Sequence, residues 1–333
     1  MDLLKVSWQA VLRSNLLTPR QLVDHLQLAP PEAARLVERP SFRVNIPLRL
    51  ANKMPKGTLD HPVTRQFVPL LEELDSAEGF IADPVGDSRC RPHARLLHKY
   101  VGRVLLTTTG ACAMHCRYCF RQHFDYTQQH GFEEELLYIR KDPSIREVIL
   151  SGGDPLSLSN GTLGRLLEAL DQIPHVAIVR FHTRFPIGIP ERIDEGLLEL
   201  LRERRAQIWW ILHSNCAEEW DDEIRKALAR VRSLGIPLLN QAVFLKGVND
   251  TVASQQALLE CLIDQGIQPY YLHQLDRVAG AAHFEVPEED GHAILEELRT
   301  RLPGYALPSF VKEEAGAPSK TRLQPTLHTL QQT

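Results

Sequence analysis

Short runs of apolar and β-branched residues alternate with amphipathic stretches through most of the chain after residue 100. Five of these runs begin 30 or 31 residues apart, at positions 147, 177, 207, 237 and 268, and another begins at 103. A strand followed by a returning helix has this length, and a stretch such as "DDEIRKALARVRSLG" has the period of an amphipathic helix. The pattern therefore predicts six βα units in succession.

Such units build two kinds of α/β fold. We predict a partial six-stranded (β/α)6 barrel, similar to a TIM barrel but open. A doubly wound open sheet would show a similar periodicity and stays as the alternative on this pattern alone. The runs share no common motif, so their even spacing indicates repeated structure and not repeated sequence.

The two ends of the chain lack this alternation. Near the start, "TPRQLVDHL" offers Thr18 as a helix N-cap, Pro19 in the first helical position and Gln21 to complete a capping box. After about residue 300 the chain becomes irregular, as in "RLPGYALPSF". We therefore predict an N-terminal helical region over 1–95, the barrel over 96–300 and a C-terminal covering segment over 301–333.

Composition narrows the class of protein. The 333 residues are 43% hydrophobic and 24% charged, with a formal net charge of −4, which gives no support to a nucleic-acid-binding face. No segment approaches the roughly 18 consecutive apolar residues of a bilayer-spanning helix. The six cysteines are too few for a disulfide framework. We expect a soluble, cytoplasmic protein with a small-molecule substrate.

Half of the cysteines lie within eight residues. Cys112, Cys116 and Cys119 have the spacing C-x3-C-x2-C. A four-iron, four-sulfur (4Fe-4S) cluster held by three thiolates keeps one iron open to a substrate or cofactor. The alternative is a structural zinc site that Cys90 or His93 would close.

The position of the motif favours a functional site. The cysteines follow the first predicted strand, at the carboxyl end where parallel α/β folds build their sites. The second predicted strand ends in "SGGDP", where Gly152 and Gly153 would let a ligand approach the backbone closely.

The cysteine motif and the Gly-Gly-Asp-Pro turn resemble those of the radical S-adenosylmethionine enzymes. Within these enzymes the chain is similar to the lysine 2,3-aminomutase family from roughly residue 60 to 320. The segments that carry this resemblance are "KYVGRVLLTTTGACAMHCRYCFRQHF", "ILSGGDPLSLS", "FHTRFPIGIPERI", "NQAVFLKGVND" and "YYLHQLDRVAGAAHF".

The resemblance implies three cofactors. Cys112, Cys116 and Cys119 would hold the 4Fe-4S cluster, whose open iron binds S-adenosylmethionine. Pyridoxal phosphate would be attached to Lys320, which follows "EEAGAPS" where the family has a glycine-rich turn. The remaining cofactor contacts that the resemblance implies are Gly152, Gly153, Asp154 and Pro155 for the methionine end, His213 and Gln241 for the same cofactor, and Lys99 and Arg103 for the pyridoxal phosphate.

The resemblance also implies a substrate and a reaction. Arg121 matches the arginine that pairs with the carboxylate of lysine, and Asp276 matches an acidic residue that faces its amino groups. Glu313 stands where the family has a second aspartate, so its charge is kept but moved by about one methylene. A 5′-deoxyadenosyl radical would take a hydrogen from the β-carbon of L-lysine, and the amino group would move from Cα to Cβ.

Within the family, "CRYCFRQHF", "GAPSKT" and an end only 13 residues after Lys320 resemble the branch that makes (R)-β-lysine for elongation factor P. The implied partners are free L-lysine, a reductase or flavodoxin-type electron donor, elongation factor P and its lysyl-transferring synthetase. A free-standing β-lysine producer and a radical S-adenosylmethionine enzyme without pyridoxal phosphate stay open as alternatives.

Overall fold

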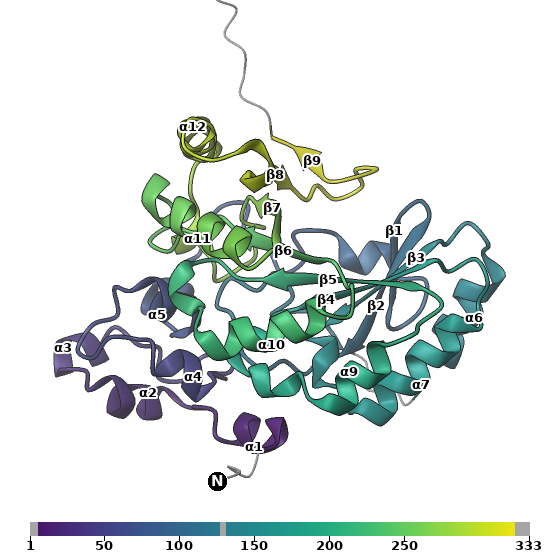
Figure 1. Ribbon diagram of the computed structural model, residues 1–333. Coiled ribbons are helices and arrows are strands. Elements are labelled where there is room, and N and C mark those ends of the chain that lie inside the picture. Colours follow the sequence, from purple (N-terminus) through teal and green to yellow (C-terminus); the bar gives the residue numbers. More distant parts are fainter. Residues whose placement is uncertain (1–5, 127–130, 324–333) are drawn as a thin grey trace, which may run out of the picture.

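One nine-stranded sheet forms the centre of the molecule (Figure 1). The computed structural model describes residues 6–126 and 131–323. Strands β2 to β8 run parallel, and β1 and β9 are antiparallel edge strands. Their bounds are β1 Leu96–Tyr100, β2 Arg103–Thr109, β3 Glu147–Gly152, β4 Ile178–Thr183, β5 Gln207–His213, β6 Leu238–Val243, β7 Gln268–His273, β8 Ser309–Lys312 and β9 Thr321–Arg322.

The order of the strands decides between the two predicted folds. Each strand pairs with the next one along the chain, whereas a doubly wound sheet reverses its order at a switch point. The predicted α/β class is therefore confirmed, and the doubly wound alternative is wrong. The sheet is open in the described ranges, because β1 and β9 are its two edges. Side chains still join its ends: the Tyr100 hydroxyl on β1 donates to Glu313 Oε1, just after β8, at 2.7 Å.

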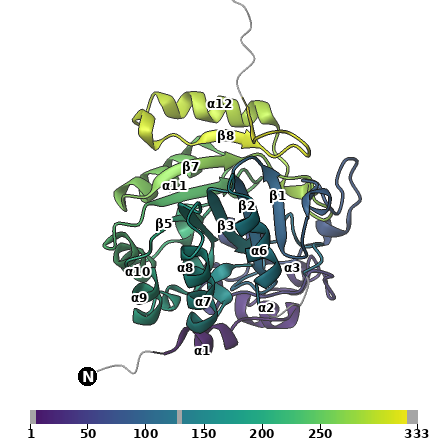
Figure 2. The same cartoon turned by 90° about the vertical axis from the view of Figure 1, so that its right-hand side faces the viewer.

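Helices follow one another around the outside of the sheet (Figure 2). Those that return the chain between parallel strands are α6 Glu133–Lys141, α7 Asn160–Asp171, α9 Glu195–Leu201, α10 Asp222–Arg232, α11 Val252–Asp264 and α12 Glu288–Arg299. All six predicted strands are present, as β2 to β7. The sequence pattern missed β8, since "SFVK" is too short to show a period, and it therefore missed a seventh parallel strand within the predicted covering segment.

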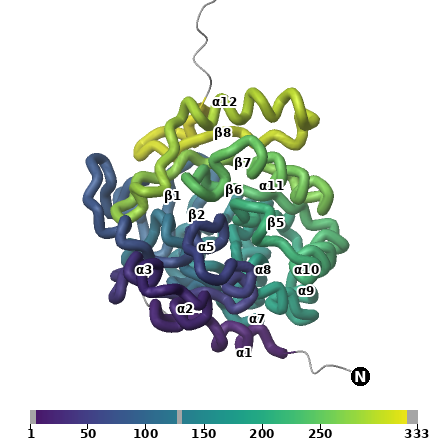
Figure 3. The backbone as a smooth tube through the Cα atoms, turned by 90° about the vertical axis from the view of Figure 1, so that its left-hand side faces the viewer, coloured from purple at the N-terminus to yellow at the C-terminus, as the bar shows by residue number. Residues whose placement is uncertain are grey.

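Short helices occupy the N-terminal part of the chain and lie together at one end of the molecule (Figure 3). They are α1 Trp8–Arg13, α2 Pro19–Leu26, α3 Pro30–Ala33, α4 Leu48–Ala51 and α5 Pro62–Phe67, and α8 Phe185–Gly188 follows β4. The predicted capping box of α2 is confirmed, because Thr18 and Gln21 bond reciprocally. Short 3-10 helices occur at Leu71–Leu74, Asp87–Cys90, Pro155–Ser157, Pro190–Arg192, Ala217–Glu219, Ala282–Phe284 and Gly304–Ala306.

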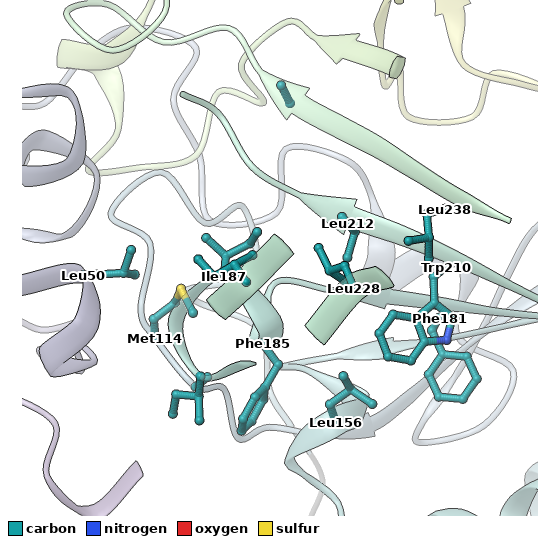
Figure 4. Close-up of a cluster of buried hydrophobic side chains, with 14 of the residues drawn as sticks. Leu50, Met114, Leu156, Phe181, Phe185, Ile187, Trp210, Leu212, Leu228 and Leu238 are labelled. Atoms are coloured by element: carbon teal, nitrogen blue, oxygen red, sulfur yellow. The ribbon is translucent and has the colours of Figure 1, made fainter. Parts of the chain in front are cut away.

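The N-terminal helices pack against the loop that carries the cysteines. Leu50 of α4, Met114 of this loop and Ile187 of α8 belong to one buried cluster (Figure 4). The packing is tight, since a Cβ added at Gly188 would lie 2.5 Å from Met114 Cε. Burial of this apolar surface fixes the loop at one side of the sheet.

Within residues 6–126 and 131–323, no helix is both long and apolar enough to cross a membrane. The division of the chain into regions 1–95, 96–300 and 301–333 stays a prediction.

Candidate active site

A cavity of about 310 Å³ opens inside the curved sheet. Its lining includes all but one of the site residues that the sequence predicts, and Pro155 is the exception. The predicted residues that line it are Lys99, Arg103, Cys112, Cys116, Cys119, Arg121, Gly152, Gly153, Asp154, His213, Gln241, Asp276, Glu313 and Lys320. Pro155 begins the short helix after β3 and is buried beside this lining. Residues more than 200 positions apart in sequence thus meet in one space.

The three cysteines of the motif lie together as free thiols. Burial raises the pKa of each thiol, to about 11 for Cys119, and neighbouring thiols add to the rise at Cys112 and Cys119. Arg184 opposes this at Cys116, because its Nη1 lies 3.3 Å from the sulfur. A positively charged metal centre binds the thiolate form, so its presence would lower the pKa of these thiols and stabilise their charge.

The N-terminal region holds the backbone of the cysteine loop. Asn45 Nδ2 donates to the carbonyl of Cys112 at 3.0 Å, and Asn15 Nδ2 donates to the carbonyl of Ala113 at 2.8 Å. The two side chains are linked, since Asn15 also donates to Asn45 Oδ1 at 2.6 Å. Further along, the Arg117 amide donates to the carbonyl of Gln66 at 2.8 Å. The loop is therefore positioned by a part of the chain that lies outside the βα units.

Close backbone packing explains the two glycines at the end of β3. Gly152 has a φ of +122°, and a Cβ there would lie 2.5 Å from the carbonyl oxygen of Thr109. A Cβ at Gly153 would lie 2.2 Å from the carbonyl oxygen of Ala111, in the cysteine loop. The sequence suggested that the glycines admit a ligand. The geometry shows that glycine is also needed for packing, because a side chain at Gly152 would collide with Thr109 and one at Gly153 with the cysteine loop.

Asp154 completes this turn and is 4% exposed. Its carboxylate accepts hydrogen bonds from the Thr183 hydroxyl and from the amides of Leu156, Arg184 and Phe185, at 2.8 to 3.0 Å. Burial nevertheless raises the pKa of Asp154, to about 6. The carboxylate thus connects the turn to the end of β4. The turn therefore offers its backbone, rather than this carboxylate, to a ligand in the cavity.

Histidines lie at the ends of three strands. His213 on β5 and Gln241 on β6 are register partners, and their Nε2 atoms are 2.9 Å apart. Sequence reasoning missed His182 on β4 and His273 on β7, which line the same cavity. The rings of His182 and His213 contact edge to face at 5.7 Å. Burial lowers the pKa of all three imidazoles, to about 3 for His213, so they are neutral near pH 7.

Lys320 faces this space from the C-terminal segment. Its Nζ lies 2.6 Å from Glu313 Oε2. The other oxygen of Glu313 accepts from the Tyr100 hydroxyl at 2.7 Å and lies 3.5 Å from Lys99 Nζ. The Lys320 cation lowers the pKa of Glu313, although burial alone would raise it. Arg103 stands nearby, with its guanidinium 5.3 Å from the centre of the Tyr100 ring.

Asp87, which sequence reasoning missed, joins two of the predicted residues. Its Oδ1 lies 2.7 Å from Lys99 Nζ, and its Oδ2 lies 2.8 Å from Arg121 Nε. These two cations lower the pKa of the buried Asp87 carboxyl against the effect of desolvation. Asp87 begins the 3-10 helix Asp87–Cys90, which precedes β1, so the rule that sites form at strand ends could not find it. That rule would have found His182 and His273.

Asp276 is a carboxylate of the cavity whose side chain has neither an ion pair nor a hydrogen bond to the protein in the described ranges. By contrast, Asp87 and Glu313 each have a cation, and Asp154 accepts hydrogen bonds from backbone amides and from Thr183. Burial raises the pKa of Asp276, to about 7, and Lys320 partly offsets the rise. An ammonium group brought by a ligand would remove this penalty.

The cysteine loop and the turn after β3 define the class of protein. The family profile described as the radical SAM superfamily matches residues 106–253. Among solved structures, SuiB of Streptococcus suis bound to its precursor peptide SuiA aligns with a TM-score of 0.50 and 15% identity, over 66% of this chain and 50% of SuiB. This second likeness shows the fold alone. The protein is a radical S-adenosylmethionine protein.

Relatives identify the family within this class. The L-lysine 2,3-aminomutase of Escherichia coli is 42% identical over 286 residues, which are 85% of this chain and 83% of the relative. That of Haemophilus influenzae is 36% identical over 320 residues and 95% of both chains. That of Clostridium subterminale is 34% identical over 326 residues, 96% of this chain and 78% of the relative. The chain belongs to the lysine 2,3-aminomutase family.

The superfamily implies a 4Fe-4S cluster and S-adenosylmethionine, and the donor set fits them. Three free thiols face one cavity beside the backbone of the Gly152 turn. No three His, Cys, Asp or Glu side chains in the described ranges converge where a single metal ion would bind. A cluster is wider than one ion, since each thiolate binds its own iron. A closed zinc site would need Cys90 or His93, and neither belongs to the cavity lining; His93 instead lies against Tyr138.

The family also implies pyridoxal phosphate, and the residues fit it as well. Lys320 supplies a primary amine in the cavity, and Lys99 and Arg103 supply cations suited to a phosphate. Glu313 holds the amine in an ion pair at 2.6 Å. Covalent attachment therefore requires this pair to separate or to exchange its proton.

Proposed function

We propose that this protein converts L-α-lysine to β-lysine, using a 4Fe-4S cluster, S-adenosylmethionine and pyridoxal phosphate. The observation that carries the proposal is that Lys320 and all three cysteines line one cavity. The cluster with its S-adenosylmethionine and the pyridoxal phosphate on Lys320 could then both act on one bound lysine substrate. Family membership supports the assignment, because the matched relatives are L-lysine 2,3-aminomutases.

The charges of the cavity suit lysine. Arg121 presents a guanidinium, the planar donor that suits a carboxylate. Asp276 presents a carboxylate without a protein cation, and this suits the side-chain ammonium of lysine. A ligand with a carboxylate at one end and an ammonium at the other would pair both groups.

Each of the predicted site residues would have a separate role in this reaction. The cofactors supply the radical and the electron sink. Cys112, Cys116 and Cys119 bind the cluster, and Lys320 holds the pyridoxal phosphate between turnovers. Arg121 and Asp276 orient the substrate, and its reacting carbon is thereby held near the cluster.

We further propose that the product is (R)-β-lysine and that it serves the modification of elongation factor P in the cytoplasm, by way of a lysyl-transferring synthetase. The support is the resemblance of "CRYCFRQHF" and "GAPSKT" to that branch of the family. A reductase or a flavodoxin-type protein would supply the electron.

Anaerobic incubation of the reconstituted protein with L-lysine, pyridoxal phosphate, S-adenosylmethionine and a reductant tests the reaction. Chiral analysis should find (R)-β-lysine, formed only when all three cofactors are present. Cleavage of S-adenosylmethionine without any β-lysine would refute the proposal and favour a radical enzyme that does not need pyridoxal phosphate.

A coupled assay tests the partner. Elongation factor P, its synthetase and ATP are added to the same mixture, and the mass of intact elongation factor P is measured. The proposal predicts a mass increase equal to one β-lysyl group. Free β-lysine that is made but never transferred would indicate a free-standing metabolic enzyme.

A further inference from the structure

We propose that Asp87 is a positioning residue that sets the substrate selectivity of Arg121, and this inference rests on the proposed function. Asp87 is 2% exposed and lies between two buried cations of the cavity. It contacts Arg121 through Nε at 2.8 Å and Lys99 through Nζ at 2.7 Å. Both contacts are made between side chains of the protein itself.

The geometry determines which part of Arg121 is left for a ligand. A guanidinium offers five N–H donors, and the single Nε–H is taken by Asp87. Nη1 lies 3.4 Å from the Ser151 hydroxyl, a long contact, and Nη2 has no hydrogen-bond partner among the described residues. Since Arg121 lines the cavity, its two terminal NH2 groups form the end that can receive a carboxylate in a bidentate pair.

The loop around Asp87 is built to hold this orientation. The carboxylate of Asp83 accepts from the Asp87 amide at 2.9 Å and from the Ser88 amide at 3.0 Å, which fixes the turn. Lys99 adds a second tie, because its Nζ donates to the carbonyl of Val85 at 2.7 Å. The backbone around Asp87 is thus fixed by three hydrogen bonds, two to Asp83 and one from Lys99.

A second aspartate that bridges an arginine and a lysine provides a matched control. Asp221 also bridges an arginine and a lysine, with Arg49 Nη1 at 3.1 Å and Lys53 Nζ at 2.8 Å, but it lies outside the cavity lining. Asp221 is the N-cap of α10 as well, and asparagine is an equally good N-cap. Asp221→Asn therefore removes a comparable bridging charge without touching the site.

The experiment compares two ligands by the absorbance change of bound pyridoxal phosphate, without turnover. L-lysine and cadaverine have the same diamine chain, but cadaverine lacks the carboxylate. In Asp87→Asn we expect the dissociation constant of L-lysine to rise about tenfold or more, an effect of the size seen when the outer contact that orients a metal ligand is removed. The constant for cadaverine should stay unchanged, and Asp221→Asn should leave both constants unchanged.

A second variant separates positioning from folding. Asp87→Ala should lose the preference for L-lysine over cadaverine, and added formate should restore it by filling the place of the carboxylate. An equal change for both ligands in Asp87→Asn, or no change for either, would overturn the inference while leaving the proposed function standing. A wild-type protein that does not respond to L-lysine at all would overturn both.

Discussion

The Nζ atom of Lys320 lies 2.6 Å from Oε2 of Glu313, within the cavity that the cysteines share. These two residues are seven positions apart on either side of the turn that contains Gly316. The carboxylate compensates the charge of the amine, whose side chain is half-buried and would be less stable there without a partner. This ion pair holds the amine of Lys320 in the cavity, where it would be available to pyridoxal phosphate.

Lys320→Arg tests the covalent role of this amine separately from its charge. Arginine keeps a cation beside Glu313, so the fold and the electrostatics of the cavity should survive. Borohydride reduction in the presence of pyridoxal phosphate should label the wild-type peptide that contains Lys320 and leave the variant unlabelled in peptide mapping. Label on another lysine of the cavity, such as Lys99, would contradict the assignment.

Asp276→Asn should weaken the binding of L-lysine. Removing one partner of a buried ion pair costs about 3 kcal/mol, which is roughly a hundredfold in the dissociation constant. The expected result is a large rise in KM with a smaller change in kcat, measured by steady-state assay of β-lysine. Equal values for the variant and the wild type would show that the ammonium lies elsewhere.

The binding of L-lysine should also depend on pH through the same residue. Because burial raises the pKa of Asp276 to about 7, the ligand-free protein holds a proton there at lower pH. An ammonium binds the carboxylate form, so the affinity should fall as the pH drops below about 7, and binding should release a proton. In Asp276→Asn this part of the pH dependence should vanish, while the part that comes from lysine itself should persist.

Asn45→Ala should make the iron–sulfur cluster less stable. The variant loses the bond from Asn45 to the Cys112 carbonyl and leaves Asn15 without one acceptor. We expect cluster affinity to fall about tenfold, measured as faster loss of cluster absorbance in the presence of a chelator. Asn160→Ala is the control, because it removes one bond, to Asp194, that does not involve the cysteine loop. Similar loss rates in the two variants would argue against a supporting role for Asn45.

Gly153→Ala should displace the cysteine loop. The added Cβ would lie 2.2 Å from the carbonyl oxygen of Ala111, and a backbone atom cannot move aside as a flexible side chain does. We expect a lower melting temperature and a low iron content after reconstitution. Gly161→Ala is the control, since a Cβ there meets its nearest atom, on Arg165, at 3.7 Å. This helical position should tolerate alanine or gain about 0.5 kcal/mol or more from it.

Some parts of this account follow from the sequence for a clear physical reason. The parallel strands β2 to β7 are apolar runs, and β3 to β7 follow one another at regular spacing, so these strands can be predicted from the residues alone. The capping box of Thr18 and Gln21 is a local interaction, and local interactions are visible in a few residues of sequence. The cysteine spacing indicates a cluster ligand set because three thiolates leave one iron open.

Other parts depend on contacts between distant residues. Asp87 reaches Arg121 across 34 positions, and Asn15 reaches Ala113 across 98. Neither contact has a sequence pattern, since each residue alone is typical of a polar loop. Strand β8 shows no period over four residues, and its place in the sheet comes from pairing with β7. Only the fold brings these groups together.

Hydrogen transfer between lysine and S-adenosylmethionine tests the central claim most directly, namely that the cysteines and Lys320 act on one molecule. L-lysine deuterated at its β-carbon is incubated anaerobically with the reconstituted protein and all cofactors, and S-adenosylmethionine is recovered for mass spectrometry. The account predicts deuterium at the 5′ carbon of S-adenosylmethionine in the wild type and none in Lys320→Arg. Recovery of deuterium-free S-adenosylmethionine from a wild-type protein that cleaves this cofactor would contradict it.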